Sequence, residues 1–196
     1  IGLPTPIDVP SSTPVPTLTP TETQTLTPSP SSTVTQTPSL TPTNTPTDTP
    51  SPTPTQCPAN GTGLRGDYYD NMDFTTLVFS RIDPQVFFNW GNGSPDPRVS
   101  TNTFSVRWIG EVMPMYSEQY NFCITSDDGS RLWVNGQLVA DNWGNHSARE
   151  RCGTITLTAC ELYSIRMEYY ENSGSAVAHL RWSSSSQEYG VIPQIN

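Results

Sequence analysis

Two adjacent aspartates, Asp127 and Asp128, are the residues of this 196-residue chain whose type and spacing most clearly indicate chemistry. They follow an alternating apolar run and precede a glycine and a second apolar run, 132–134, which ends in Asn-Gly. Period-2 spacing is typical of strands and Asn-Gly of tight hairpins, so both carboxylates are predicted at one strand end. Neighbouring carboxylates repel each other, and a hard cation such as Ca²⁺ or Mg²⁺ relieves that repulsion. The other interpretation is a polar turn, because Asp and Gly dominate turns.

Short segments with apolar residues at every second position supply the strands that would hold this pair. They are residues 64–69, 86–89, 103–109, 120–126, 131–134, 154–158, 162–170 and 176–182. Clusters of Gly, Asn, Asp, Ser and Pro separate these segments and are typical of turns. No helical period is evident between them. Many short strands at regular spacing predict an all-β fold, namely an antiparallel β-sandwich.

The first 56 residues differ in composition from the rest and contain 14 of the 20 prolines. Thr-Pro and Ser-Pro units repeat along this segment, which has no aromatic residue, cysteine or positive charge. Proline removes backbone donors and little apolar surface is present, so we expect a disordered or polyproline II-like stalk. The composition is typical of O-glycosylated stalks, and a bare spacer is the alternative. The chain is therefore divided into a stalk, 1–56, and a domain, 57–196.

The net charge of −9 and the absence of lysine argue against binding to nucleic acid. No apolar run is long enough to span a bilayer, so no membrane insertion is expected. No signal peptide is recognisable, and a processed product or a fragment is expected. The four cysteines form no CxxC pair, which favours two disulfides over a zinc site. Disulfides and a stalk together predict an extracellular location, secreted or on the cell surface.

Strand parity favours one of the three disulfide pairings. Cys123 and Cys152 both have the parity of outward-facing residues in their strands. A Cys123–Cys152 bridge suits this arrangement and leaves Cys57–Cys160, which would tie the stalk junction to the domain. The other pairings stay open, because residues of like parity need not be neighbours.

Several motifs, in order, resemble the PA14 domain family. They are GLRGDYYD at 63–70, RIDP at 81–84, FNWG at 88–91, FSVRWIG at 104–110, the Asp-Asp-Gly stretch at 126–136, DNW at 141–143, EYYEN at 168–172, LRW at 180–182 and VIP at 191–193. The resemblance covers about residues 61–193 and nothing of the stalk. It implies a β-sandwich that often binds carbohydrate through calcium.

The resemblance also implies a set of calcium ligands. In lectin-like members two consecutive aspartates joined by a cis peptide hold the ion, and Asp127 and Asp128 match that pair. The other ligands would be the Asn172 side chain and the carbonyls of Gly174 and Ala176. Calcium takes about six to eight oxygen ligands, so five protein positions leave vacancies for two adjacent sugar hydroxyls.

Loop residues beside the ion select the sugar in such members. Asn142, Trp143, His146 and Ser173 are the candidates in this sequence, together with the Asp127, Asp128 and Asn172 ligands. A core position is the competing interpretation for Trp143.

The function predicted is an adhesin-like carbohydrate-binding module on a stalk, with Ca²⁺ as cofactor and glycans as partners. An enzyme is not expected: adjacent aspartates are ill placed to flank a glycosidic bond, and neither histidine has a nucleophile motif nearby. The alternative is a structural component of a surface layer or glycosylated filament, self-assembling through the Thr/Pro-rich segment. In that case the calcium site would be structural or absent.

Overall fold

A computed structural model describes residues 57–58 and 61–193, and the predictions made for the stalk lie outside these residues. The described residues form eleven strands and no helix, so no membrane-spanning helix is found among them. The strands are β1 (Leu64–Tyr69), β2 (Leu77–Asp83), β3 (Phe87–Gly91), β4 (Phe104–Val112), β5 (Glu118–Asp127), β6 (Gly129–Val134), β7 (Gln137–Asn142), β8 (Arg149–Leu157), β9 (Tyr163–Glu171), β10 (Ala176–Ser183) and β11 (Gly190–Val191).

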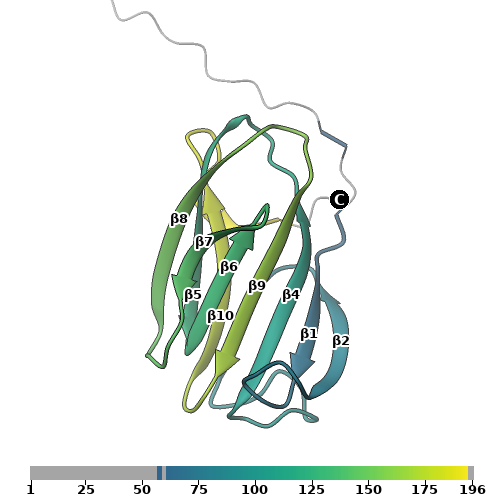
Figure 1. Ribbon diagram of the computed structural model, residues 1–196, viewed down its shortest axis with the longest axis vertical. Helices are drawn as coiled ribbons and strands as arrows, with labels where there is room; N and C mark the ends of the chain where they lie inside the picture. The colour runs from purple at the N-terminus through teal and green to yellow at the C-terminus, as the bar shows by residue number, and fades with distance from the viewer. Residues whose placement is uncertain (1–56, 59–60, 194–196) are drawn as a thin grey trace, which may run out of the picture. The chain divides into compact units, whose positions relative to one another are not determined.

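The strands form two sheets that lie face to face (Figure 1). One sheet has six strands in the order β2-β1-β4-β9-β6-β7. The other has the order β11-β10-β5-β8, with β3 also paired to β10. All of these pairings are antiparallel. The predicted antiparallel β-sandwich is therefore confirmed.

The core lies between the sheets, because each strand turns every second side chain inward. β5 contributes Tyr120, Phe122 and Ile124, and β9 contributes Ile165 and Met167, all of them buried. Burying a side chain of this size contributes about 1.5–3 kcal/mol, so the alternation seen in the sequence also supplies the stability. The same alternation fixes the register, because a shift by one residue would turn these side chains to solvent.

All eight predicted strands are present, with ends that differ by up to five residues, and β2, β7 and β11 were not predicted. β2 and β7 are the two edges of the six-stranded sheet, and β11 is an edge of the other. Edge strands cover less of the core, so their residues alternate less clearly between apolar and polar. β2, for example, is mostly exposed or half-buried along its length.

Two disulfides have the pairing that strand parity favoured. Cys123 and Cys152 lie opposite each other on β5 and β8, with their Cα atoms 4.1 Å apart. Cys57 is bonded to Cys160, 103 residues later, and so fixes the start of the domain to the turn between β8 and β9. Disulfides of this kind persist in oxidising compartments, which indicates a location outside the cytoplasm.

One buried carboxylate, that of Asp83, connects β1, β2 and β4 through hydrogen bonds. Asp83 is 3% exposed and accepts hydrogen bonds from the Tyr68 hydroxyl (2.6 Å), Trp108 Nε1 (2.8 Å) and Arg81 Nε (2.6 Å). Arg81 Nη2 also donates to the Tyr68 hydroxyl at 2.7 Å. Burial, followed by the hydrogen bond to Asp83, raises the pKa of Tyr68 well above its usual range. One carboxylate therefore satisfies three donors from three strands.

Candidate functional site

The aspartate pair lies at one end of the sandwich. Asp127 ends β5, Asp128 connects it to β6, and a cis peptide bond joins the two residues. Asp127 is half-buried and Asp128 is 5% exposed. Close packing explains why the motif has a glycine at position 129, because a Cβ there would lie 2.3 Å from Cε1 of Tyr170. The Asp-Asp-Gly sequence thus leads from β5 in one sheet to β6 in the other, and its glycine packs closely on Tyr170.

The Asp128 carboxylate connects two loops that are distant in sequence. Its Oδ1 accepts from the backbone N–H of His146 at 2.9 Å. Its Oδ2 accepts from the backbone N–H groups of Asn172 (2.8 Å) and Ser173 (3.3 Å). The structure therefore brings together three stretches that the sequence analysis selected separately.

Glu171 is a third carboxylate at this site, and the sequence analysis did not include it among the ligands. Oxygen atoms of Asp127, Asp128 and Glu171 all lie within 4.8 Å of one another. Glu171 is fully buried, and its Oε1 has no hydrogen-bond partner among the described residues. The signal was available in the sequence: Glu171 has the parity of Ile165 and Met167 and must face inward at the end of β9.

The charge of Asp128 acts on the other two carboxylates. Burial and the nearby charge of Asp128 raise the pKa of Glu171 to about 7. Burial and Asp128 also raise the pKa of Asp127. The Tyr169 hydroxyl lies 2.5 Å from the Asp127 carbonyl, to which it donates, and 3.2 Å from Oε2 of Glu171. One phenol proton cannot satisfy both acceptors fully, so the cluster has more oxygen acceptors than donors.

This donor set fits a hard divalent cation. Carboxylate and carbonyl oxygens are the ligands that Ca²⁺ and Mg²⁺ prefer, and no sulfur or imidazole nitrogen is among them. The buried Oε1 of Glu171 is an acceptor that a cation would satisfy. The residues present are thus compatible with the ion that the resemblance implies.

Asn142 was predicted to contact the sugar, and the structure contradicts this prediction. It is 1% exposed at the end of β7, and its amide is engaged within the protein. Nδ2 donates to Ser126 Oγ (3.0 Å) and to the Arg149 carbonyl (3.2 Å), and Oδ1 accepts from Arg149 Nε (2.7 Å). Ser126 and Ser130 are in turn linked at 2.7 Å. A buried and saturated amide cannot contact a sugar, so Asn142 supports the strands beneath the aspartates.

Three other predicted sugar contacts lie in the loops around the pair. Trp143 packs edge-on against Tyr170, with ring centres 4.7 Å apart, and also contacts Phe74 and Arg131. These contacts favour the packing interpretation of Trp143. The ring nitrogens of His146 lie 2.8 and 3.0 Å from backbone carbonyls, so this ring is held within its own loop. Ser173 is exposed.

The loop after β9 lies beside the aspartate pair. Asn172 is half-buried and adjoins Asp128 through its backbone. Ligation by its side chain, and by the carbonyls of Gly174 and Ala176, stays a prediction.

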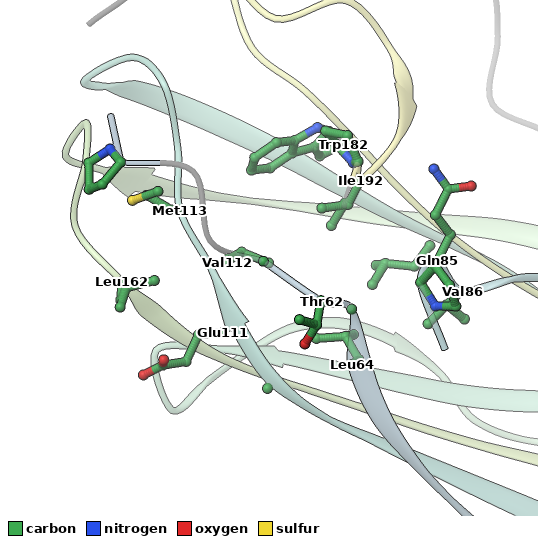
Figure 2. A pocket seen from close by; sticks show the side chains of 17 residues that line it. Thr62, Leu64, Gln85, Val86, Glu111, Val112, Met113, Leu162, Trp182 and Ile192 are labelled. Carbon is green, nitrogen blue, oxygen red and sulfur yellow. The ribbon is translucent and has the colours of Figure 1, made fainter. Parts of the chain in front are cut away.

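A large cavity lies at the opposite end of the sandwich, away from the aspartates. Its volume is about 420 Å³, and its lining is mostly apolar, with Leu64, Val112, Trp182 and Ile192 around it (Figure 2). Val112 ends β4 at the end of β9 that is remote from Glu171. Among the described residues of the lining, Glu111 is the single carboxylate. The cavity is therefore separate from the carboxylates of Asp127, Asp128 and Glu171.

Comparisons with known proteins identify relatives of the sandwich. Residues 60–196 match the PA14 domain family. Anti-sigma-I factor RsgI3 of Acetivibrio thermocellus is 50% identical over 135 residues, which are 69% of this chain and 21% of that protein. The chain thus spans about a fifth of the length of this relative.

Two solved structures extend the comparison. An anti-sigma factor domain-containing protein superposes with a TM-score of 0.67 at 50% identity, covering 69% of this chain and 48% of that one. The PA14 sugar-binding domain from an RTX adhesin superposes with a TM-score of 0.56 at 20% identity, covering 67% and 95%. The second likeness shows the fold alone. Because the family match spans the whole sandwich and more than half of the sequence, the chain belongs to the PA14 domain family.

Proposed function

We propose that this PA14 domain is an extracellular carbohydrate-binding module, not an enzyme, that holds one Ca²⁺ and binds a sugar diol. The observation that carries the proposal is the convergence of Asp127, Asp128 and the Asn172 loop around a buried, unpartnered oxygen of Glu171. The solved sugar-binding domain of an RTX adhesin, which has the same fold, adds support.

Each residue at the site has a defined task in this proposal. Asp127 and Asp128 provide charged oxygens from one side, and Asn172 provides its amide oxygen from the other. Asp128 also fixes the distance between the two sides, because it accepts the backbone N–H of Asn172 at 2.8 Å. Glu171 adds negative charge from the buried side of the site. A bound Ca²⁺ supplies coordination positions that two neighbouring hydroxyls can fill.

The exposed loops around the pair would choose among sugars. Ser173 and the loop of His146 border the site and offer polar groups to hydroxyls outside the coordination sphere. Each such contact is modest, so we expect affinities of about millimolar to high micromolar for one site. Many copies displayed on stalks would raise the avidity by orders of magnitude, as an adhesin requires.

A sensing role is a second candidate, and the 50% identity to anti-sigma-I factor RsgI3 favours it. In that role the domain would be the glycan-binding part of a longer signalling protein. Both roles require the same site. They differ in the consequence of binding: adhesion depends on many copies, whereas sensing requires one occupied domain to change a neighbouring segment.

The full chain is expected to bind selected sugars on a glycan array at millimolar calcium and to lose them when calcium is chelated. Calcium should also stabilise the domain, by about 2.7 kcal/mol at a hundredfold excess over its dissociation constant. If calcium stabilises the chain and no glycan binds, the ion is structural. If calcium leaves the melting curve unchanged, the proposed metal site is wrong.

Replacing Glu171 by glutamine should change stability and calcium binding in opposite directions. The calcium-free chain should melt at a higher temperature, because a buried charge beside Asp128 is removed and the shape is kept. Calcium affinity should fall about tenfold, because the ion loses a neighbouring negative charge. Scanning calorimetry and calcium titration at pH 8 measure the two effects.

Glu168→Gln is the matched control, on the same strand but facing outward. Glu168 pairs with Arg107 at 2.9 Å near the surface, so its loss should lower the melting temperature slightly. Calcium affinity should not change. If Glu171→Gln behaves like this control, Glu171 is not part of the metal site.

A further inference from the structure

The outer face of the five-stranded sheet carries two exposed aromatic rings beside a set of polar groups. Phe87 on β3 is 48% exposed, and Tyr189, just before β11, is 50% exposed. The other large apolar side chains exposed on the described residues lie on or beside the six-stranded sheet: Met72, Leu77, Ile82, Ile109, Leu138 and Leu162. We name the face around the first two rings, with His179, Arg181 and Glu150, the aromatic edge patch.

The rings are held in fixed positions by the sheet beneath them. Phe87 lies opposite His179 on β10, and the two rings stack with centres 4.1 Å apart and planes inclined by 17°. The guanidinium of Arg181 lies 5.2 Å from the Phe87 ring centre and 5.7 Å from that of Tyr189. One arginine therefore lies against both rings and connects them, so little conformational freedom is left to lose on binding a ligand.

Hydrogen-bonding groups lie directly beside the rings. Glu150 on β8 accepts from Thr125 Oγ1 at 3.1 Å and from the Tyr189 hydroxyl, and lies 3.6 Å from Arg181. Burial and the charge of Arg181 lower the pKa of His179, which favours its neutral form. Neither ring nitrogen of His179 has a hydrogen-bond partner in the described part of the chain. A half-buried imidazole thus has one free donor and one free acceptor next to an exposed aromatic ring.

We propose that the aromatic edge patch is a second carbohydrate site that needs no metal ion and binds a segment of polysaccharide. A pyranose ring has an apolar C–H face and a rim of hydroxyls. Its C–H face would pack on Phe87 and on Tyr189, while His179 and Glu150 exchange hydrogen bonds with the rim. A stable protein interface usually has a larger apolar core than two separated rings provide. The aromatic rings of this patch match the apolar face of a sugar, and its polar groups match the hydroxyls.

The position of the patch indicates an extended ligand. Thr125, opposite His179, precedes Asp127 by two residues on β5 and therefore has the same parity along this strand. Two rings that flank one arginine can contact successive sugar units. The ligand class is therefore a polysaccharide chain bound along its length, and this binding does not require the calcium site.

Affinity electrophoresis of the full chain tests this inference, with xyloglucan, arabinoxylan, mixed-linkage β-glucan and galactomannan as probes and EDTA in every gel. At least one probe should retard the wild-type chain. Phe87→Ala and Tyr189→Ala should each weaken that retardation about tenfold, because each removes one ring. Tyr189→Phe keeps the ring and should retain most of the binding.

One further variant serves as a control. Leu138→Ala, equally exposed on the other sheet, should bind like the wild type. The EDTA in every gel separates this site from the calcium site. The inference is overturned if no probe binds in EDTA, or if both ring variants bind like the wild type. It is also overturned if sedimentation shows a wild-type dimer that Phe87→Ala dissociates, because the patch would then be a self-association surface.

Discussion

Asp127→Ala should weaken calcium binding by the full chain at least about a hundredfold, which corresponds to about 2.7 kcal/mol. Asp127 is half-buried at the end of β5, and its carboxylate accepts a hydrogen bond from the backbone of Ala148. Its removal takes a charged ligand from the ion and one contact from the loop before β8, whereas removal of Asp128 would take away three loop contacts. Isothermal calorimetry in the presence and absence of a competing chelator provides the measurement.

Asp128 is the less informative residue to change, although it is the more buried of the pair. Its oxygens accept three backbone N–H groups, from His146, Asn172 and Ser173. Alanine at this position would release both loops and reduce calcium binding for a structural reason. Asp127 separates the two effects, because the calcium-free melting temperature of Asp127→Ala should equal or exceed that of the wild type.

Asp141→Ala is the matched control for this prediction. It makes the same change in net charge close to the site, at an exposed carboxylate that pairs with Arg131 at 3.1 Å. Calcium affinity should stay within about twofold of the wild type, since exposed charges are screened. Equal losses for Asp127→Ala and Asp141→Ala would mean that overall charge, and no specific site, governs binding.

The strands that were predicted most accurately from the sequence are those that turn every second side chain into the core. In β5 and β10 apolar residues alternate without interruption, and both strands were found within two residues of their ends. The missed strands β2, β7 and β11 are edges, where hydrogen bonding to one neighbour determines the structure more than side-chain burial does. Local sequence carries little information about such pairing.

The site shows the same division between local and distant information. Asp127 and Asp128 could be selected because they are adjacent in sequence and repel each other. Glu171 lies 43 residues after Asp128 and joins the cluster only because β9 and β6 are paired. Asn142 was misplaced for the opposite reason: it was taken as a loop residue, whereas β7 extends to Asn142 and turns its side chain inward. Parity along a strand would have predicted both positions once the strand ends were known.

Asp83→Ala is expected to cause a large loss of stability, about 3–5 kcal/mol. Three donors lose their acceptor together: the Tyr68 hydroxyl, Trp108 Nε1 and Arg81 Nε. The first two donors are fully buried, and each unsatisfied buried donor costs about 1–3 kcal/mol. The Arg81 guanidinium also lies 4.5 Å from the centre of the Tyr68 ring, so its charge would lose a partner beside a packed aromatic group. Urea unfolding of the full chain measures this loss, and the melting temperature should fall by about 10–20 °C.

Two further substitutions show whether burial is the cause. Asp83→Asn keeps one acceptor for Tyr68 and Trp108 but turns an amide N–H toward Arg81, so its loss should be intermediate. Asp96→Ala removes a carboxylate that pairs with Arg98 at 2.7 Å, with the same two-residue spacing as Arg81 and Asp83. Arg98 lowers the pKa of Asp96 to about 2, yet this pair is at the surface and its loss should leave the unfolding curve nearly unchanged. If Asp83→Ala is no more destabilising than Asp96→Ala, the buried carboxylate does not hold β1, β2 and β4 together, and apolar packing alone accounts for that side of the sandwich.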